Sequence, residues 1–538
     1  MVVPQTIFDV LAATAARFPG RPFIHVLPET AAAYGIASGE TTFRAMLSRV
    51  VSLREAYAGA GYRAGCRVGL LLENRPAFFE HWFALNALGI SVVPINPDLR
   101  AGELEYLVSH SEMIAAVVLP SRQRDIAAAS KGTQRFDIFG PDEAIPAQCA
   151  RSTETQTLTR ETECALLYTS GTTGRPKGCV LTNTYFHNSG DWYLTIGGHV
   201  QLTPGVERML TPLPLFHMNA MATSTMTMLM MGGCLTVLDR FHPKTWWSSV
   251  REARATIVHY LGVMPPMLMG APESADDRTH CVRFGFGAGC DRRLHAAFED
   301  RFGFPLIEAW AMTETGGGVV IAAAHEPRKV GTNGFGKPGP ECEVRVVADD
   351  GREAVADQAG ELLCRRAGPD PQHGFFREYL KDPEATAEAW ADGWFHTGDI
   401  VRRDAEGTFT FVDRRKNVIR RSGENISAVE VESALLLHPR VAAVAVAATP
   451  DDVRGDEVFA CVVLRSMGSN PGLIAREIVT FCLSRLAYYK APGYVAFVDA
   501  LPLTSTQKIQ RGAMKGIVAS LVETGAAIDT RSMKKRMA

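Results

Sequence analysis

The residues best suited to chemistry form one polar loop, which reads Tyr168-Thr-Ser-Gly-Thr-Thr-Gly-Arg-Pro-Lys-Gly178. Its hydroxyl groups donate hydrogen bonds, its glycines let backbone amides approach an oxygen atom closely, and its lysine adds a positive charge. The residues that supply these groups are Thr169, Ser170, Gly171, Thr172, Thr173, Gly174 and Lys177. A polar surface turn is the plain alternative for such a composition, but the ordered combination predicts a polyphosphate site. The loop follows a predicted strand and precedes a stretch that we expect to be helical.

A second glycine-rich segment, Gly285-Phe-Gly-Ala-Gly289, ends another predicted strand. It is superficially similar to the dinucleotide fingerprint GxGxxG, but the sixth position is Cys290 instead of glycine, so we exclude NAD binding. The Walker A spacing GxxxxGK[ST] is likewise absent from the polar loop. A tight turn from strand to helix is the structural interpretation of residues 285–289.

Other side chains are of the types that a nucleotide site needs. Glu314 offers a hard oxygen ligand for the magnesium of a nucleotide triphosphate, and Thr313 beside it can bond a phosphate. Asp399 can accept hydrogen bonds from two ribose hydroxyls, because a carboxylate accepts several. Each of these residues alone is more often a helix cap or a member of a surface ion pair. His217 lies among apolar residues, where a histidine is commonly a packed core residue.

The elements that must position these residues follow the pattern of an α/β protein. Residues 68–72 read as a strand, 77–88 as a helix and 90–95 as a second strand, which is typical of a parallel βαβ unit. Further strands are predicted at 115–119, 165–168, 235–238, 256–261, 282–286 and 306–310, mostly separated by stretches long enough for helices. This alternation predicts a large N-terminal domain of doubly wound α/β layers.

The pattern of residue types changes after Gly334. Short β segments there alternate with glycine and acidic turns, which indicates a small antiparallel unit. The last part reads as a compact α+β domain, with a helix over 427–437, strands at 441–446 and 458–464, and a helix over 473–486. We expect an N-terminal domain of residues 1–414 and a mobile C-terminal domain of residues 415–538. Lys416, at the end of the charged run 413–416, is the predicted hinge between them.

Composition limits the class of protein. The 538 residues exceed one ordinary core, and a net charge of -2 with 46% hydrophobic and 21% charged residues provides no global field for nucleic acid or anionic membrane. The 11 cysteines include no CxxC pair, which favours reduced thiols and a cytoplasmic location. Residues 209–238 lack charged side chains, but prolines, His217 and Asn219 interrupt them, so we expect buried core and no membrane span.

Taken together, the motifs resemble those of the adenylate-forming superfamily, which includes acyl-CoA synthetases, carrier-loading adenylation domains and luciferases. The resemblance covers nearly the whole chain and keeps the order of the family's motifs. Besides the polar loop, the matching segments are 212–217, 310–314, 394–399, 414–419 and 422–426. Within the superfamily, Arg421-Ser-Gly-Glu-Asn-Ile-Ser427 and Phe216-His-Met-Asn-Ala220 look most like the crotonobetaine/carnitine-CoA ligase branch.

This resemblance assigns roles to individual residues. It implies that Lys508, Lys177, Thr313, Glu314 and His217 act in catalysis, with Glu314 on magnesium and His217 as an aromatic gate near the acid. It implies nucleotide contacts for the polar loop, for Gly287, Ala288 and Gly289, for Trp310, Ala311 and Met312, and for Asp399 and Arg414. It places Gly423 at the pantetheine of coenzyme A. The chain departs from the family in two places, since Trp310-Ala311 replaces the usual Tyr-Gly and Gln507 replaces a glycine before Lys508.

The implied activity is an ATP-dependent acid–thiol ligation in two half-reactions. The carboxylic acid first attacks the α-phosphorus of magnesium ATP to give an acyl-adenylate and pyrophosphate. Coenzyme A then attacks the adenylate after the C-terminal domain has turned about Lys416, which withdraws Lys508 and brings in Gly423. The cosubstrates are therefore ATP, Mg²⁺ and coenzyme A.

Two other functions remain open from the sequence. A stand-alone enzyme that loads a carrier protein would share the first half-reaction, and a catalytically impaired nucleotide-binding relative would keep only binding. The acid is equally open between a crotonobetaine-like or carnitine-like compound and a short or medium-chain aliphatic acid. Methionines of 218–231 and 263–267 suit an adaptable apolar pocket or plain core, and Asp191-Trp192 has the groups that a betaine needs. Both a monomer and a homodimer are compatible with the chain.

Overall fold

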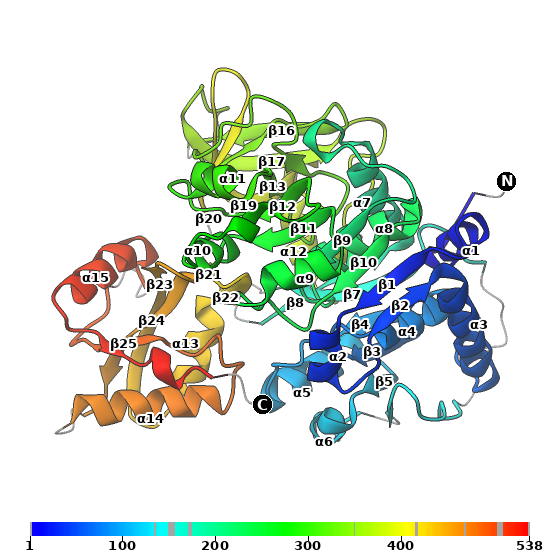
Figure 1. Cartoon of the computed structure of the whole chain (residues 1–538). Coiled ribbons are helices and arrows are strands. Elements are labelled where there is room, and N and C mark those ends of the chain that lie inside the picture. Colours follow the sequence, from blue (N-terminus) through cyan, green and yellow to red (C-terminus); the bar gives the residue numbers. More distant parts are fainter. Residues whose placement is uncertain are drawn as a thin grey trace. The chain divides into compact units, whose positions relative to one another are not determined.

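A computed structural model describes residues 3–133, 136–148, 157–169, 175–348, 350–414, 418–466, 470–502 and 509–535. The chain divides into two compact units (Figure 1). Unit 1 contains Met1–Pro97, Ser109–Leu167 and Gly178–Asp413, and unit 2 contains Asp98–Val108, Tyr168–Lys177 and Arg414–Ala538. Lys416 lies outside the described residues, so the hinge and the boundary at 414/415 stay predictions.

A seven-stranded sheet contains the predicted βαβ unit. Strand β3 (Arg67–Leu71), helix α4 (Pro76–Asn86) and strand β4 (Ser91–Pro94) follow one another, and the two strands pair in parallel. All four residues of β4 are buried, as expected for a strand with helices on both faces. The sheet has the order β18-β8-β7-β4-β3-β5-β6. Its other strands are β5 (Ala115–Val118), β6 (Asp137–Phe139), β7 (Glu163–Thr169), β8 (Lys177–Thr182) and β18 (Glu378–Tyr379).

The expectation that a helix directly follows the polar loop is wrong, because a strand comes first. The loop leaves β7 and enters β8, an adjacent strand of the same sheet, and helix α7 (Asn183–Thr195) begins only afterwards. The run Gly-Cys-Val-Leu-Thr after Lys177 is buried throughout, and a short buried apolar run is compatible with either a helix or a strand until its partners are known. Lys177 is therefore the first residue of a strand, and no helix dipole acts at this end of the loop.

An eight-stranded sheet has the order β14-β13-β12-β11-β9-β10-β1-β2. Its central strands are parallel, with Ile257 of β11 opposite Met209 of β9 and Phe284 of β12. Only the edge strands β2 and β14 run antiparallel to their neighbours. The bounds are β1 (Pro22–Val26), β2 (Gly39–Thr42), β9 (Arg208–Thr211), β10 (Cys234–Val237), β11 (Ile257–Leu261), β12 (Phe284–Ala288), β13 (Leu306–Trp310) and β14 (Ile321–Ala322).

Helices cover these sheets and bury apolar faces against them. Helix α1 (Ile7–Arg17) begins with a capping box, in which Thr6 and Asp9 bond each other's backbone amides, and it buries Ile7 and Leu11. The other helices of unit 1 are α2 (Pro28–Tyr34), α3 (Phe43–Gly59), α6 (Gln123–Ala129), α9 (Trp246–Glu252), α10 (Met264–Met269), α11 (His295–Phe302) and α12 (Pro383–Ala389), while α5 (Ala101–Ser111) crosses from unit 2 into unit 1.

The uncharged segment 209–238 forms core, as predicted. It contributes β9, a π-helix η3 (Asn219–Ser224), helix α8 (Thr225–Met231) and β10. Met221, Met226 and Met228 are fully buried. In the described part of the chain, no helix is both long enough and apolar enough to cross a membrane.

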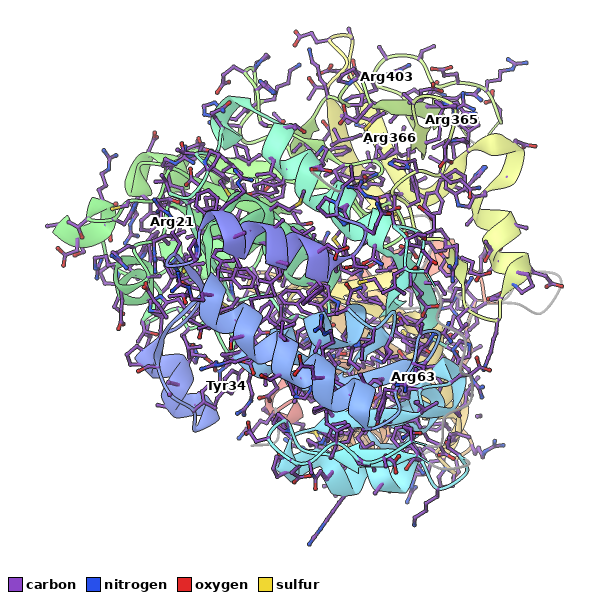
Figure 2. All side chains as sticks on the ribbon, turned by 90° about the vertical axis from the view of Figure 1, so that its right-hand side faces the viewer. Arg21, Tyr34, Arg63, Arg365, Arg366 and Arg403 are labelled. Atoms are coloured by element: carbon purple, nitrogen blue, oxygen red, sulfur yellow. The ribbon has the colours of Figure 1, made fainter. Side chains whose placement is uncertain are left out.

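The small antiparallel unit predicted after Gly334 is a five-stranded sheet with the order β15-β20-β19-β17-β16. Figure 2 shows Arg365 and Arg366 of β17 and Arg403 of β19 on this sheet, where Arg365 pairs with Glu343 and lies over the Trp394 ring. Arg365 and Arg366 are consecutive and therefore point to opposite faces of the sheet, and Arg366 donates to the carbonyl of Gly318 at 3.1 Å. The strands are β15 (Gly334–Gly336), β16 (Cys342–Val347), β17 (Ala359–Arg366), β19 (Phe395–Arg403) and β20 (Phe409–Arg414).

The C-terminal part is the predicted α+β domain. The long hairpin β23–β24 forms its centre, with β25 parallel to β24 and with helices α13 and α14 packed together. Its core contains Val431, Ile478 and Val495. The elements are β21 (Val418–Arg421), β22 (Glu424–Ser427), α13 (Ala428–Leu436), β23 (Val441–Asp451), β24 (Gly455–Leu464), α14 (Pro471–Leu483), β25 (Tyr494–Phe497), α15 (Arg511–Glu523) and β26 (Ile528–Asp529).

Candidate functional site

Four of the predicted site segments of unit 1 follow four neighbouring parallel strands, β9, β11, β12 and β13. Leu261 at the end of β11 lies opposite Ala288 of β12, and Gly287 lies opposite Glu308 of β13. Because the carboxyl ends of parallel strands share one edge of a sheet, the segments 212–217, 262–263, 289–290 and 311–314 all leave that edge. This is where ligands bind in open α/β sheets.

The glycines at this edge are required by close packing of backbones. A Cβ atom on Gly287 would lie 2.2 Å from the carbonyl oxygen of Tyr260, and one on Gly262 would lie 2.0 Å from that of Gly289. Gly289 also has φ +79°, a conformation that glycine adopts without strain. The tight-turn interpretation of 285–289 therefore has a direct structural basis, while contacts of Gly287, Ala288 and Gly289 with substrate stay predictions.

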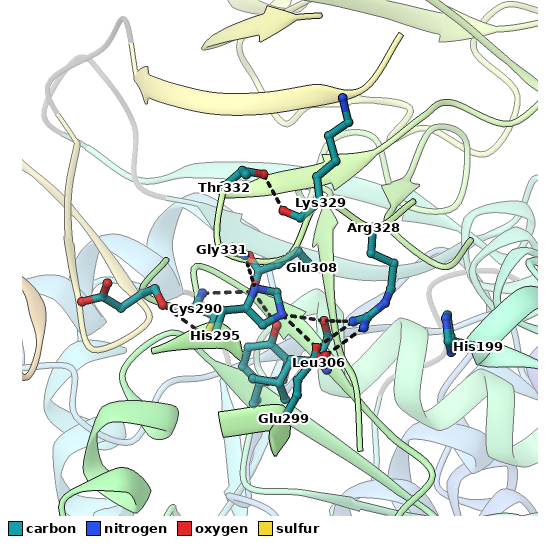
Figure 3. A network of polar contacts seen from close by, with 12 residues as sticks. His199, Cys290, His295, Glu299, Leu306, Glu308, Arg328, Lys329, Gly331 and Thr332 are labelled. Atoms are coloured by element: carbon teal, nitrogen blue, oxygen red, sulfur yellow. Dashed lines mark hydrogen bonds and ion pairs between the residues drawn. The ribbon is translucent and has the colours of Figure 1, made fainter. Parts of the chain in front are cut away.

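A buried carboxylate that the sequence analysis missed holds this turn. Glu308 accepts hydrogen bonds from the backbone amides of Gly289 (2.7 Å) and Cys290 (3.0 Å) and from the hydroxyl of Tyr260. Figure 3 shows Glu308 and Cys290 in this network. Burial raises the pKa of Glu308, and these three donors act against that shift. A charged residue inside the otherwise apolar strand Leu-Ile-Glu-Ala-Trp was the available signal, because carboxylates are rarely buried without partners.

A second polar network stands beside Glu308 and fixes the start of β13. Arg328 donates to both carboxylate oxygens of Glu299 at 2.6 and 2.8 Å, and the amide of Leu306 donates to the same group (Figure 3). Burial would raise the pKa of Glu299, but the hydrogen bonds from Arg328, His295 and Leu306 lower it to about 2. The first residue of the strand that carries Glu308 and Trp310 is thus hydrogen-bonded to a carboxylate that Arg328 holds in place.

Trp310 and Asp399, predicted to contact adenine and ribose, are bonded to each other. The indole Nε1 of Trp310 donates to Oδ2 of Asp399 at 2.9 Å, and Asp399 is 2% exposed. The amide of Asp399 donates to the hydroxyl of Thr397, which in turn donates to the carbonyl of Leu362. The five-stranded sheet therefore holds this carboxylate beside the indole that ends β13.

Glu314, the predicted magnesium ligand, is buried and oriented by a phenol. The hydroxyl of Tyr379 donates to Oε1 of Glu314 at 2.8 Å, and burial together with Glu314 raises the pKa of Tyr379. The hydroxyl of Tyr185 donates to the carbonyl of Thr313 at 2.9 Å. Both tyrosines come from elements far away in sequence and were not predicted. Ala311 is exposed, and Met312 and Thr313 are half-buried.

His217 is half-buried, and its ring lies 4.7 Å from that of Phe216. Its carbonyl accepts a hydrogen bond from the amide of Met221, so His217 leads directly into the π-helix η3. A π-turn within a helix is frequent at functional sites. His217 as a gate stays a prediction.

The π-helix η3 is tied to β11 by a buried histidine that the sequence analysis did not single out. His259 Nδ1 lies 2.8 Å from Oδ1 of Asn219 and 3.0 Å from the hydroxyl of Ser224, while its Nε2 lies 3.1 Å from the hydroxyl of Tyr193. Because the amide oxygen of Asn219 only accepts, we assign the proton to Nδ1 and the donor role at Nε2 to Tyr193. Burial lowers the pKa of His259 to about 3, which keeps this neutral form.

The polar loop is described at its two ends. Thr169 is the last residue of β7 and Lys177 the first of β8. Ser170, Gly171, Thr172, Thr173 and Gly174 lie outside the described residues. Just before Lys177, the carbonyl of Pro176 accepts a hydrogen bond from the hydroxyl of Tyr106.

The catalytic groups predicted in the last 125 residues are described only in part. Gly423 forms the turn between β21 and β22, and Arg414 is the last residue of β20. Lys508 and the side chain of Arg414 lie outside the described residues. Arg511, shortly after Lys508, donates to both oxygens of Glu432 from its two terminal nitrogens.

Comparison with known proteins identifies the class. Residues 11–380 match the AMP-binding enzyme family, and residues 430–508 match the C-terminal domain of AMP-binding enzymes. The crotonobetaine/carnitine-CoA ligase of Shigella flexneri is 32% identical over 482 residues, which cover 85% of this chain and 89% of that protein. The chain belongs to the AMP-binding enzyme family. It is an adenylate-forming enzyme of the acyl-CoA ligase type, as the motif resemblance predicted.

Solved structures of AMP-binding enzymes share the fold. The o-succinylbenzoate CoA synthetase of Bacillus subtilis superposes with a TM-score of 0.80 at 24% identity, over 94% of this chain and 98% of that one. The fatty acyl CoA synthetase of Mycobacterium tuberculosis has a TM-score of 0.65 at 26% identity, over 96% and 98% of the two chains. AMP-binding enzymes of this type use ATP and coenzyme A. The acid differs among these relatives, so their names leave the acid of this chain open.

Proposed function

We propose that this AMP-binding enzyme joins a small carboxylic acid to free coenzyme A through an acyl-adenylate, with release of pyrophosphate and AMP. The observation that supports this best is the carboxyl edge of the eight-stranded sheet. Glu308 holds the Gly289 turn there, and Trp310 and Glu314 follow from the adjacent strand. The hydrogen-bonded Trp310 and Asp399 suit an adenine and a ribose bound side by side.

Magnesium belongs to the proposal as the ion that ATP brings. Mg²⁺ is usually held by one or two carboxylates together with substrate phosphates and waters. Glu314 suits this role, because Tyr379 fixes one carboxylate oxygen and a carboxylate has further lone pairs for a metal. Among the described residues, no group of three or more His, Cys, Asp or Glu side chains forms a complete metal cage. A site completed by ATP fits that composition.

The first half-reaction needs charge stabilisation and position. The acid carboxylate attacks the α-phosphorus in line, and negative charge moves onto the leaving pyrophosphate. Lys177 and the hydroxyls of the polar loop neutralise that charge, Thr313 bonds the α-phosphate, and Lys508 holds the attacking carboxylate against the phosphate. No group of the protein becomes covalently modified.

In the second half-reaction, the Gly423 turn of the C-terminal domain takes the place of Lys508 at the site. We propose that residues 415–538 turn about Lys416, so that Lys508 leaves and the Gly423 turn meets the pantetheine. The thiol of coenzyme A then attacks the acyl carbonyl, the bond to the phosphate breaks, and AMP departs. The cysteines among the described residues form no disulfide, which suits a reducing compartment, and we expect the enzyme in the cytoplasm.

We propose an acid with an apolar body of short or medium length, beside the η3 segment and Val263. A betaine held by Asp191 and Trp192 is disfavoured, because Trp192 is buried against Tyr193 and Phe286 whereas Asp191 is exposed. Consecutive residues of a helix point to different sides and do not enclose one cation. Crotonobetaine and carnitine stay in the test because the similar ligase of Shigella flexneri carries them in its name.

An acid panel tests the proposal. Pyrophosphate release is measured with each acid and ATP, with and without coenzyme A, and products are identified by mass spectrometry. Acyl-CoA and AMP are expected in equal amounts with at least one aliphatic acid. Pyrophosphate release without any consumption of coenzyme A would point instead to a carrier protein as acceptor, and no release with any acid would contradict the ligase activity.

The hinge has its own experiment. Lys416→Pro fixes φ near −65° and should restrict the turn of the C-terminal domain. We expect one half-reaction to persist and the other to fall, measured as adenylate formation and as thioester formation from prepared acyl-adenylate. Wild-type rates in both would show that the pivot lies elsewhere.

A further inference from the structure

The turn that carries Gly423 has a backbone conformation that needs support. It joins β21 to β22 in two residues, with Arg421 opposite Glu424. Ser422 has φ +50° and Gly423 has φ +88°, and positive φ at both central residues characterises a type I′ hairpin turn. Glycine adopts this conformation freely, but a serine is strained in it. Something must therefore hold Ser422 in place.

The residue before the turn is anchored in the interior. The side chain of Arg421 is 2% exposed, and its Nε donates to both carboxylate oxygens of Glu457, at 2.9 and 2.8 Å. Glu457 lies on β24 and is itself fully buried. The backbone adds a second tie, since the amide of Ser422 donates to the carbonyl of Arg454 at 2.9 Å. Both ties fasten the turn to the central hairpin of the domain.

A second basic residue, Lys534 near the C-terminus, bonds the same carboxylate of Glu457. Lys534, whose side chain is fully buried, bonds Oε1 of Glu457, and the amide of Val458 donates to that oxygen at 2.8 Å. Burial, assisted by the nearby Arg421, lowers the pKa of Lys534 to about 7. Glu457 thus has two cationic partners, and only one of them belongs to the turn.

We propose that Arg421, held by Glu457, is the positioning residue that keeps the Ser422–Gly423 turn ready for thioester formation. This inference rests on the proposed role of Gly423 in the second half-reaction. The turn must present Gly423 to the pantetheine in one conformation, and a displacement of about 1 Å in a reacting assembly costs on the order of 100-fold in rate. Arg421 lies on the strand that enters the turn, so losing its anchor releases the turn directly.

The two cations provide a matched pair of variants. Arg421→Met removes the anchor of the turn but leaves Glu457 paired with Lys534 and Val458, so no buried charge is orphaned. Lys534→Met removes the other basic side chain that bonds the same carboxylate and leaves the Arg421 anchor intact. Differences between the two variants therefore report on the turn and not on the general loss of a basic partner of Glu457.

Each variant is measured in both half-reactions. Pyrophosphate release from acid and ATP should stay near wild type in Arg421→Met, whereas thioester formation from prepared acyl-adenylate should fall on the order of 100-fold. We expect Lys534→Met to keep both rates. Thermal unfolding of each variant checks that the C-terminal domain is folded.

A rescue experiment separates positioning from general damage. Ser422→Gly removes the strain at φ +50°, so it should restore much of the thioester rate to Arg421→Met. An equal loss in Arg421→Met and Lys534→Met, a parallel loss of adenylation in Arg421→Met, or an unchanged thioester rate would each overturn the proposal. Failure of the proposed function looks different, because the wild-type enzyme itself would then form no thioester.

Discussion

The indole Nε1 of Trp310 donates a hydrogen bond to Oδ2 of Asp399, although 89 positions separate the two residues. The ring that we expect against adenine thus also orients the carboxylate that we expect on the ribose. A tyrosine, which the resembled family commonly has at this position, lacks the indole N–H that makes this bond. A change of Trp310 in the adenine subsite should therefore alter binding in the ribose subsite.

Trp310→Phe tests this coupling, because phenylalanine keeps an aromatic ring and removes the N–H donor. We expect discrimination between ATP and 2′-deoxy-ATP, measured as the ratio of their kcat/KM values, to fall roughly fivefold. Trp247→Phe, which alters a tryptophan stacked on His280, is the matched control and should keep the ratio. An unchanged ratio in Trp310→Phe would separate the indole from the ribose subsite. Equal kcat/KM values for ATP and 2′-deoxy-ATP in the wild-type enzyme would instead contradict the assignment of Asp399 to the ribose.

Arg511 is a structural ion-pair member in the described chain. Its two terminal nitrogens donate hydrogen bonds to both oxygens of Glu432 on α13. This ion pair fixes the chain shortly after Lys508. We expect Arg511→Lys, which loses the fork but keeps the charge, to lower pyrophosphate release roughly tenfold, and Lys508→Ala to abolish it.

Thioester formation from prepared acyl-adenylate distinguishes these roles further. It should stay near wild type in Lys508→Ala, since the ammonium serves only adenylation. Adenylation that survives Lys508→Ala but is lost in Arg511→Ala would transfer the catalytic role to Arg511.

Lys177 should act on the transition state for adenylation. Lys177→Ala removes one charged contact with the developing pyrophosphate, and the expected loss of turnover is on the order of 100-fold to 1000-fold at saturating ATP. Protein stability should change little, because Lys177 begins β8 at a half-buried position. Arg175→Ala changes a neighbouring cation, which lies over the Tyr106 ring, and serves as a control with a small expected effect. Undiminished turnover in Lys177→Ala would exclude this lysine from the mechanism.

His259 should make stability depend on pH. Burial lowers the pKa of His259 from 6.5 to about 3. Between these two pH values, His259 therefore binds a proton in the unfolded chain but not in the folded chain. The stabilising contribution is therefore complete above pH 6.5 and is lost as the pH falls toward 3. The midpoint of urea unfolding should fall over this range, and His259→Gln should start lower at pH 7 but decline less steeply. A slope equal to that of wild type would contradict this assignment.

The sequence by itself determined the family, the order of the motifs and much of the secondary structure. Helix α4 and strands β3 and β4 were predictable because two short apolar runs flank a stretch of helical length, and this order can be read from neighbouring residues alone. The polar loop was recognisable for the same reason, since its hydroxyls, glycines and lysine are consecutive. Strand β8 was missed because a short buried apolar run has no period that separates a strand from a helix.

The tertiary structure alone decided which side chains meet. Three contacts join residues that are far apart in the sequence and lie on different strands or on the turn after one. They are the bond between Trp310 and Asp399, the hydrogen bond from Gly289 to Glu308, and the ion pair of Arg421 with Glu457. No local pattern encodes such a pair, because the partner is chosen by sheet order and register. Burial then makes these pairings obligatory, since a charge or donor removed from water must find a partner inside the fold.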